Sequence, residues 1–189
     1  MILKYTLFIF LVLSVSMTLK AQPDTPDELE ESLKQSITER AEAFQEFVAI
    51  LADKDQSRSV KDNAYSAAIE LFEDKNTIIE VSTKRKDEII INEIAISDYL
   101  RKLTILPYDS VAFEFEPYYM ESFQERTERL YESTVLLNQH FRGYQAGDMQ
   151  YSDFTIKRVY VEALKSVGAK PEDQYWEILF TKITVVETY

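Results

Sequence analysis

His140 is the only histidine of the 189-residue chain, and the sequence contains no cysteine. Zinc sites built from histidine and cysteine are therefore excluded, and so are paired Glu-x-x-His di-iron motifs. Catalysis of the Ser-His-Asp type would have to use His140, with Asp153 as the acid that orients it. A one-residue shift in strand pairing would instead place Phe141 opposite Asp153. We favour a plain surface or half-buried strand histidine and assign no catalytic residue.

Aromatic side chains are the second group that could form a site, because the chain has 12 Tyr, 11 Phe and one Trp. Most of these rings are expected to pack in the core or on a sheet surface, where each contributes about 1.5–3 kcal/mol by burial. A few could line a ligand cavity. Judged by their positions along the chain, the pocket candidates are Tyr65, Tyr99, Tyr119 and Trp176, together with His140 and Asp153.

The charge balance excludes several partners, because 33 acidic residues stand against 21 basic ones and give a formal charge of -12. Such a chain repels nucleic acid and anionic lipid unless its bases are clustered. The single basic cluster, residues 84–86, is too small to neutralise many phosphates. The three glycines stand in predicted turns and form no phosphate-binding loop. The sequence predicts no nucleic-acid partner, no metal and no cofactor.

The first 21 residues are typical of a secretory signal peptide, because Lys4 precedes an apolar run at residues 5–17. That run is too short for a membrane-spanning helix, which needs about 18 or more apolar residues. We expect cleavage after Ala21, no membrane insertion after cleavage, and export to the periplasm or the extracellular space. Residues 22–26 would then form a short tether, and residues 27–189 a single domain.

The elements that must position these side chains begin with helices. Thr25 and Glu28 can form a capping box with Pro26 at the first helical position, and the apolar stripe that follows predicts a helix to about Asp53. Periodicity and runs of β-branched residues predict three further elements. They are a helix at 59–72, a hairpin at 77–91 with its tip at 84–87, and a helix at 97–103.

Long strands complete the chain. They are expected at residues 110–119, 130–142, 150–164 and 174–187. Turn residues at 143–148 and 168–171 connect the last three strands in antiparallel order. Helices first and long antiparallel strands last predict an α+β fold, in which a strongly curved, mostly antiparallel sheet wraps around the N-terminal helices.

Several segments within this layout resemble secreted members of the nuclear transport factor 2-like superfamily. They are residues 71–74, 77–81, 98–103, 141–144 and 151–153. The resemblance covers residues 27–189 and implies a cone, with a curved sheet closed by the opening helices. It leaves the function open, because this cone hosts isomerases, dehydratases, cyclases, hydrolases, transport factors and plain binding modules. In the cone enzymes a Tyr donor faces an Asp or Glu base whose pKa is raised by burial.

We interpret the chain as a secreted, non-enzymatic binding or interaction module whose cone-shaped pocket takes a small molecule or a peptide. The alternative is a small cofactor-free enzyme of the isomerase or dehydratase kind, which uses an acid and a Tyr inside the cone. Apolar residues point to both faces of the long strands, as at 135–137 and 178–180. This pattern also predicts a homodimer through the sheet.

Overall fold

The computed structural model describes residues 26–85, 88–166 and 175–189 of the chain. Several sequence predictions lie partly or wholly outside the described residues. They are the signal peptide at 1–21, the tether at 22–26, the hairpin tip at 84–87 and the turn at 168–171. Within the described ranges, no helix combines the length and the apolar character needed to cross a membrane.

Three helices form in the predicted order: α1 (Pro26–Ala52), α2 (Arg58–Ile69) and α3 (Ile96–Leu103). The apolar stripe of α1 is buried because it faces the sheet and the other helices. Its most buried members are each at most 2% exposed: Leu33, Ile37, Ala41, Phe44, Val48 and Leu51. Periodicity alone therefore identified the face of α1 that builds the core.

The end of α2 differs from the prediction. The helix stops at Ile69, and not near residue 72, because the chain turns there to pair with the last strand. The Leu71 carbonyl accepts a hydrogen bond from the Phe180 N–H at 3.0 Å, and Phe72 forms an isolated parallel bridge with Phe180. A long-range pairing partner, which local periodicity cannot show, ends this helix.

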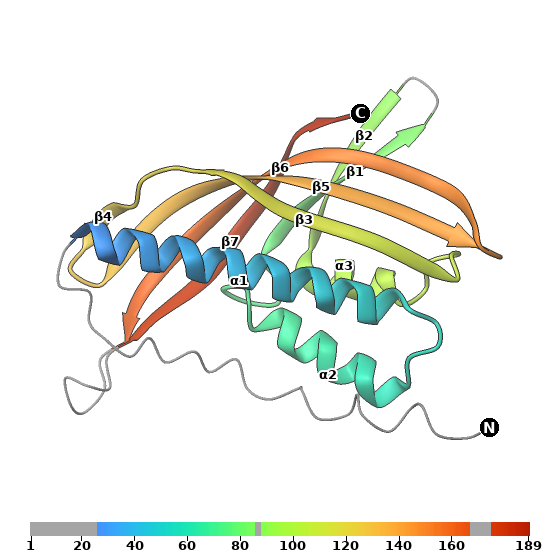
Figure 1. Cartoon of the computed structure of the whole chain (residues 1–189), viewed down its shortest axis with the longest axis horizontal. Helices are drawn as coiled ribbons and strands as arrows, with labels where there is room; N and C mark the ends of the chain where they lie inside the picture. The colour runs from blue at the N-terminus through green and yellow to red at the C-terminus, as the bar shows by residue number, and fades with distance from the viewer. Residues whose placement is uncertain (1–25, 86–87, 167–174) are drawn as a thin grey trace.

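Seven strands form one sheet in the described part of the chain, in the order β2-β1-β7-β6-β5-β3, with β4 also paired to β5 (Figure 1). Their bounds are β1 (Ile78–Arg85), β2 (Glu88–Ala95), β3 (Ser110–Met120), β4 (Gln124–Thr127), β5 (Leu130–Gln145), β6 (Asp148–Ser166) and β7 (Tyr175–Thr188). Neighbouring strands are antiparallel except β1 and β7, which meet in parallel at Ile79 and Ile183. β4 was not predicted, because its four residues are polar and exposed.

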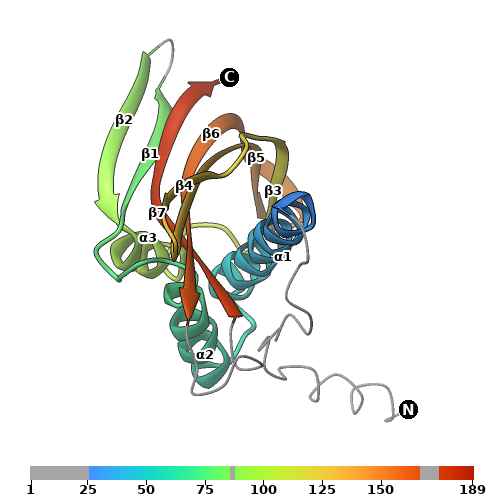
Figure 2. The ribbon, with the colours of Figure 1, turned by 90° about the vertical axis from the view of Figure 1, so that its left-hand side faces the viewer.

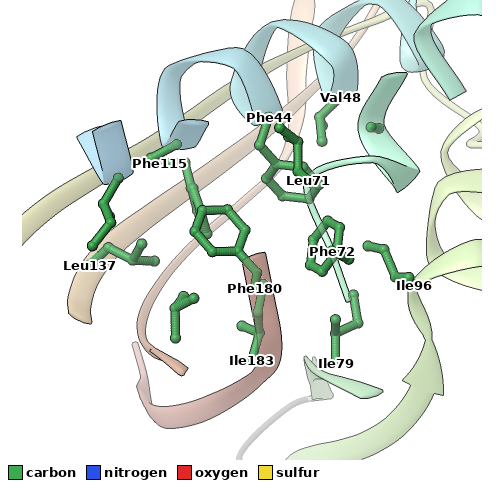
Figure 3. Close-up of a cluster of buried hydrophobic side chains, with 14 of the residues drawn as sticks. Phe44, Val48, Leu71, Phe72, Ile79, Ile96, Phe115, Leu137, Phe180 and Ile183 are labelled. Carbon is green, nitrogen blue, oxygen red and sulfur yellow. The ribbon is translucent and has the colours of Figure 1, made fainter. Parts of the chain in front are cut away.

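The sheet curls around α1, and α2 and α3 pack beside this helix, so that the helices fill the concave side (Figures 1 and 2). Register shifts in the β3–β5, β5–β6 and β6–β7 pairs help the sheet to bend. The core lies between the two layers, where Phe44, Phe72 and Phe180 pack edge to face (Figure 3). This architecture confirms the predicted α+β fold with a curved sheet around N-terminal helices.

Gly143 was expected in a turn but lies inside β5. The turn comes later, at Ala146 and Gly147, where both residues have positive φ angles of 53° and 88°. At Gly143 the absence of a side chain lets the Tyr108 ring lie against the strand, because an added Cβ would stand 2.6 Å from the Tyr108 Cγ atom. This close approach positions Tyr108 over the inner face of the sheet.

Candidate functional site

Two of the predicted pocket residues, Asp153 and Tyr99, lie close enough to interact inside the cone. Asp153 is on the inner face of β6 and is 9% exposed. Tyr99 comes from α3, and its ring stacks on Phe44 of the core with centroids 6.5 Å apart. Burial raises the pKa of Tyr99 far above its ordinary value, and the negative charge of Asp153 raises it further. The phenol therefore stays protonated and can only donate or accept a hydrogen bond.

Three aromatic rings surround the position of Asp153. Phe141 is the cross-strand partner of Asp153 on β5, and Tyr151 precedes it by two residues on the same face of β6. Tyr108 packs on both, with ring centroids 6.0 Å from Phe141 and 6.4 Å from Tyr151. Phe141 and Tyr151 are themselves 6.0 Å apart. These rings, which we call the aromatic cluster, give the carboxyl group apolar surroundings.

The electrostatics of Asp153 follow from these surroundings. Burial raises the pKa of the Asp153 carboxyl, whereas a hydrogen bond from Tyr151 and the positive charge of Lys157 act in the opposite direction. Its Oδ1 atom is buried and has no hydrogen-bond partner among the described residues. Buried polar atoms are nearly always paired, so this acceptor is an exception that needs an explanation.

Lys157 continues the polar row along the inner face of β6. The side chain is 3% exposed, and its Nζ atom donates to the backbone carbonyl of Glu80 at 2.5 Å. Burial lowers the pKa of Lys157 from 10.5 to about 8, although Asp153 and Glu80 both act to raise it. The amine therefore begins to lose its proton within about one pH unit of neutrality.

Hydroxyl groups complete this row where β1 separates from β7. Thr155 lies between Asp153 and Lys157, and its Oγ1 is 3.3 Å from Ser82 Oγ and 3.4 Å from Thr188 Oγ1. Thr188 in turn donates to Ser82 at 2.8 Å. The backbones of β1 and β7 pair at a single position, Ile79 with Ile183. The hydrogen bonds among these side chains therefore connect β1 to the rest of the sheet beyond that position. We call Asp153, Thr155 and Lys157 the inner polar row.

The remaining ring candidates lie away from Asp153. The Arg101 guanidinium lies over the ring of Tyr65 in α2, 5.8 Å from the ring centre. Trp176 packs against Tyr131, with ring centroids 5.2 Å apart, and pairs with Lys165 at the far end of β6. Tyr119 of β3 is 53% exposed. Of the predicted pocket residues, the fold therefore brings Tyr99 close to Asp153 but leaves Tyr65, Tyr119 and Trp176 elsewhere.

His140 lies on the opposite face of the sheet from Asp153. The register pairs Phe141 with Asp153 and His140 with Phe154, so a Ser-His-Asp arrangement with Asp153 does not form. The His140 side chain is 32% exposed. Its polar partners are Ser152, at 3.1 Å from Nε2, and Glu114, at 3.6 Å from Nδ1, and its ring also lies edge to face with Phe154. These two partners come from neighbouring strands and could not be read from the sequence without the register.

A separate polar cavity of about 380 Å³ lies on the outer side of the sheet. It is lined by parts of β4, β5, β6 and β7 and by the segment before β4: Glu121, Ser122, Gln124, Arg126, Glu132, Ser133, Thr134, Tyr160, Val161, Glu162 and Thr181. Arg126 is already paired with Glu132 at 2.7 Å. Burial, reinforced by the charges of Glu73 and Glu132, raises the pKa of Glu162. This cavity was missed because β4 was not predicted.

The site lacks an arrangement for a metal within the described ranges. No group of three or more His, Asp or Glu side chains there is placed to hold a metal ion. Among the described residues, the groups on the inner face of β6 that can act chemically include the Asp153 carboxyl group, the phenols near it and the Lys157 amine. Such groups can bind through hydrogen bonds or transfer protons.

Tyr108, Tyr151 and Lys157 were not among the predicted site residues, although a signal for one of them was present. Apolar residues occupy alternate positions of β6 at Val159 and Val161, which are buried. Lys157 and Asp153 continue that alternation toward the start of the strand. Polar residues at the strand positions that face the core are candidates for a site, because burying a polar group without a partner is costly.

Comparisons with known proteins place this site in a known fold. The chain matches no protein-family model and no curated protein sequence. A scytalone dehydratase-like protein from Novosphingobium aromaticivorans aligns with a TM-score of 0.51 at 8% identity, over 86% of this chain and 90% of that chain. The beta subunit of benzoate 1,2-dioxygenase from Burkholderia mallei aligns with a TM-score of 0.40 at 10% identity, over 87% and 91% of the two chains. Naphthalene 1,2-dioxygenase with indole bound also gives 0.40, at 11% identity over 85% and 86%.

The first of these alignments shows the fold. This chain folds as an α+β cone, in which a curved, mostly antiparallel sheet wraps around the helices, and this confirms the predicted fold class. At 8% identity the alignment establishes the fold alone. The function therefore has to be argued from the residues inside and outside the cone.

Proposed function

We propose that this protein is a non-enzymatic binding domain that holds a small molecule inside the cone, with Asp153 as the buried hydrogen-bond acceptor. One observation carries the proposal: Asp153 is 9% exposed, and its Oδ1 atom is buried without a partner in the described part of the chain. An unsatisfied buried group costs roughly 1–3 kcal/mol. A ligand that donates a hydrogen bond to Oδ1 would recover that free energy.

The surroundings of Asp153 favour a particular ligand chemistry. The aromatic cluster of Tyr108, Phe141 and Tyr151 suits a flat, largely apolar body, and Asp153 suits a hydroxyl or amine group carried on it. The rings pack on one another, and Tyr108 belongs to the segment between α3 and β3. A ligand would therefore reach Asp153 by displacing the Tyr108 ring. Phenols and aryl amines have both required features.

A binding experiment tests this proposal. A panel of small phenols and aryl amines is screened for its effect on the melting temperature of the wild type, Asp153→Asn and Asp148→Asn. Asp148 is exposed at the start of β6 and serves as the matched control. We expect a compound that stabilises the wild type and the control but has a much smaller effect on Asp153→Asn. Equal stabilisation of all three proteins, or no stabilisation by any compound, would contradict the proposal.

A second function is favoured by the raised pKa of Asp153 and by its hydrogen bond from Tyr151. A carboxylate in such a site is a stronger base than an exposed one, and a nearby phenol can stabilise an enolate. The protein would then be a cofactor-free enzyme of the isomerase or dehydratase kind. Asp153 would remove a proton from the carbon beside a carbonyl and return it to another atom.

Deuterium uptake separates the two functions. An enzyme of this kind would exchange the α protons of 2-indanone in heavy water, as followed by NMR, and Asp153→Asn would abolish the exchange. A binding domain would bind without accelerating the exchange beyond the rate in buffer. Exchange that is unchanged in Asp153→Asn would exclude Asp153 as the base.

We also propose that the protein is exported after loss of residues 1–21 and that it pairs with a second copy through the sheet. The apolar run at residues 5–17 supports export. Leu136 and Leu179, half-buried on the outer face, support pairing. Amino-terminal sequencing of protein from the periplasmic fraction tests export, and a start at Met1 would contradict it. Light scattering tests pairing, and a monomeric mass would contradict it.

A further inference from the structure

Four polar side chains meet on the outer face of β3, β5 and β6, and we call them the outer-face cluster. They are Ser152, His140, Glu114 and Arg142. Strand register builds the cluster, because Glu114 is paired with His140, and Arg142 is paired with Ser152. Directly opposite residues hold their Cβ atoms about 4.5–5.5 Å apart on one face of a sheet. Three rigid strands therefore fix the positions of these side chains.

The contacts within the cluster form a relay. The Nε2 atom of His140 is 3.1 Å from the Ser152 Oγ, and its Nδ1 atom is 3.6 Å from Glu114 Oε2. The other oxygen of Glu114 accepts a hydrogen bond from Arg142. Glu114 thus contacts both His140 and Arg142, and these two flank Ser152. A base within hydrogen-bond reach of a hydroxyl, oriented by a third group, is the arrangement that activates a nucleophile.

We propose that Ser152 is a reactive nucleophile, with His140 as its base, and that it accepts acyl groups from small carboxylic esters. Ser152 is exposed, and the side chains of His140 and Glu114 are 32% and 46% exposed, so a small ester can approach from solvent. Arg142 is the cross-strand partner of Ser152, and its guanidinium donates to Glu114, which holds that carboxylate beside His140. This site is on the opposite face from Asp153 and does not depend on the function proposed for the interior.

The reaction balances without any further reagent. The Ser152 Oγ attacks the carbonyl carbon of the ester while its proton moves to His140 Nε2. The bond between the carbonyl carbon and the alcohol oxygen then breaks, and the alcohol leaves with the proton from His140. Water hydrolyses the acyl-serine by the same steps, with His140 again taking a proton, and regenerates Ser152.

The contacts of the outer-face cluster are expected to add little to stability, because the Glu114 side chain is 46% exposed. Exposed ion pairs and hydrogen bonds on a protein surface contribute at most about 1 kcal/mol each, because water competes for the same groups. The His140 and Glu114 side chains are 32% and 46% exposed, so a substrate reaches the outer-face cluster directly from solvent. We therefore expect reactivity toward small, activated esters and toward serine-directed phosphonates.

The experiment treats the full chain with a fluorophosphonate probe and locates the modified residue by peptide mass spectrometry. Ser152→Ala removes the nucleophile, and Ser110→Ala, at an exposed serine that starts β3, is the matched control. We expect labelling at residue 152 in the wild type and the control and none in Ser152→Ala. His140→Gln should slow the labelling by roughly 100-fold, which is within the range of general-base contributions.

A companion measurement follows the hydrolysis of 4-nitrophenyl acetate by the same proteins. Glu114→Ala should slow both reactions, and Glu114→Asp should recover part of the rate if the carboxylate orients His140. Circular dichroism and the melting temperature show whether each variant is folded. No labelling of the folded wild type, or equal labelling of the wild type and Ser152→Ala, would overturn the proposal. Equal labelling rates in native and urea-unfolded protein would overturn it too.

Discussion

The two faces of β6 carry polar residues side by side along one strand, but they experience opposite environments. Asp153 and Lys157 point inward and are 9% and 3% exposed, whereas Ser152 lies outward in solvent. Inside, removal from water shifts the pKa of Asp153 upward and that of Lys157 downward. On the outer face, strand register sets which side chains contact Ser152. Burial therefore governs the properties of the inner polar row, and strand register governs those of the outer-face cluster.

The largest expected effect tests whether the two faces really differ in packing. Leu137 is on the inner face and is 1% exposed, while its neighbour Leu136 is half-buried on the outer face. Leu137→Ala should lower the free energy of unfolding by about 2–5 kcal/mol, because it leaves a cavity in the core. Leu136→Ala should cost clearly less. Urea unfolding of both variants checks this, and equal losses would mean that the two faces are equally buried.

The next prediction concerns Lys157, whose pKa is lowered to about 8 in the folded protein. Between this value and the unfolded value near 10.5, the unfolded chain binds more protons, so stability rises with pH. Fully deprotonating Lys157 should contribute about 3 kcal/mol of this rise, since one pKa unit corresponds to about 1.4 kcal/mol. Lys157→Met should remove this contribution, and stability should then rise less steeply with pH.

The measurement is the free energy of unfolding from about pH 7 to about pH 10 for the wild type, Lys157→Met and Lys182→Met. Lys182 is exposed on the outer side of β7 and serves as the control. It should keep the pH dependence of the wild type. A Lys157→Met protein with the same slope as the wild type would show that this amine is not buried in solution.

Gly143 provides a smaller effect on the inner face. A methyl group there would meet the Tyr108 ring at 2.6 Å, so Gly143→Ala has to move Tyr108 away from the sheet. We expect a loss of about 1–3 kcal/mol, as for other overpacked sites. Gly143→Ala combined with Tyr108→Ala should recover part of the loss. If the double variant loses as much free energy of unfolding as Gly143→Ala and Tyr108→Ala lose together, the clash is not the cause.

The smallest effect is expected on the outer face. Glu114 contacts His140 and Arg142, but its side chain is 46% exposed. Glu114→Gln should change the free energy of unfolding by less than about 1 kcal/mol, because water screens exposed pairs. High salt should reduce the difference from the wild type further. A loss as large as that of Leu137→Ala would show that the Glu114 contacts are buried in solution and contradict the exposure of the outer-face cluster.

Much of the fold could be predicted because its signals are local. The stripe on α1 repeats every three or four residues, and β5 and β6 are long segments in which β-branched and aromatic residues recur. The errors have a common cause in long-range pairing. α2 ends early because Leu71 and Phe72 pair with Phe180, and β4 exists only through its pairing with β5.

The candidate sites were predictable only in part. Asp153 and Tyr99 were named from their positions, but nothing in the sequence joined them to Tyr108, which comes from the segment after α3. The partners of His140 were missed because two registers were equally acceptable in the sequence. A shift of one residue exchanges Phe141 for His140 opposite Asp153 and moves each side chain to the other face.

Local patterns, which act over a few positions, predict most of the helices and strands and their order, but not β4 or the end of α2. The side of each strand that faces the helices, and the neighbours that residues of distant strands acquire, depend on the assembled sheet. Strand pairing is selected by the burial of a whole face at once. One register therefore withdraws Asp153 and Lys157 from water and leaves Ser152 and His140 beside each other on the outside.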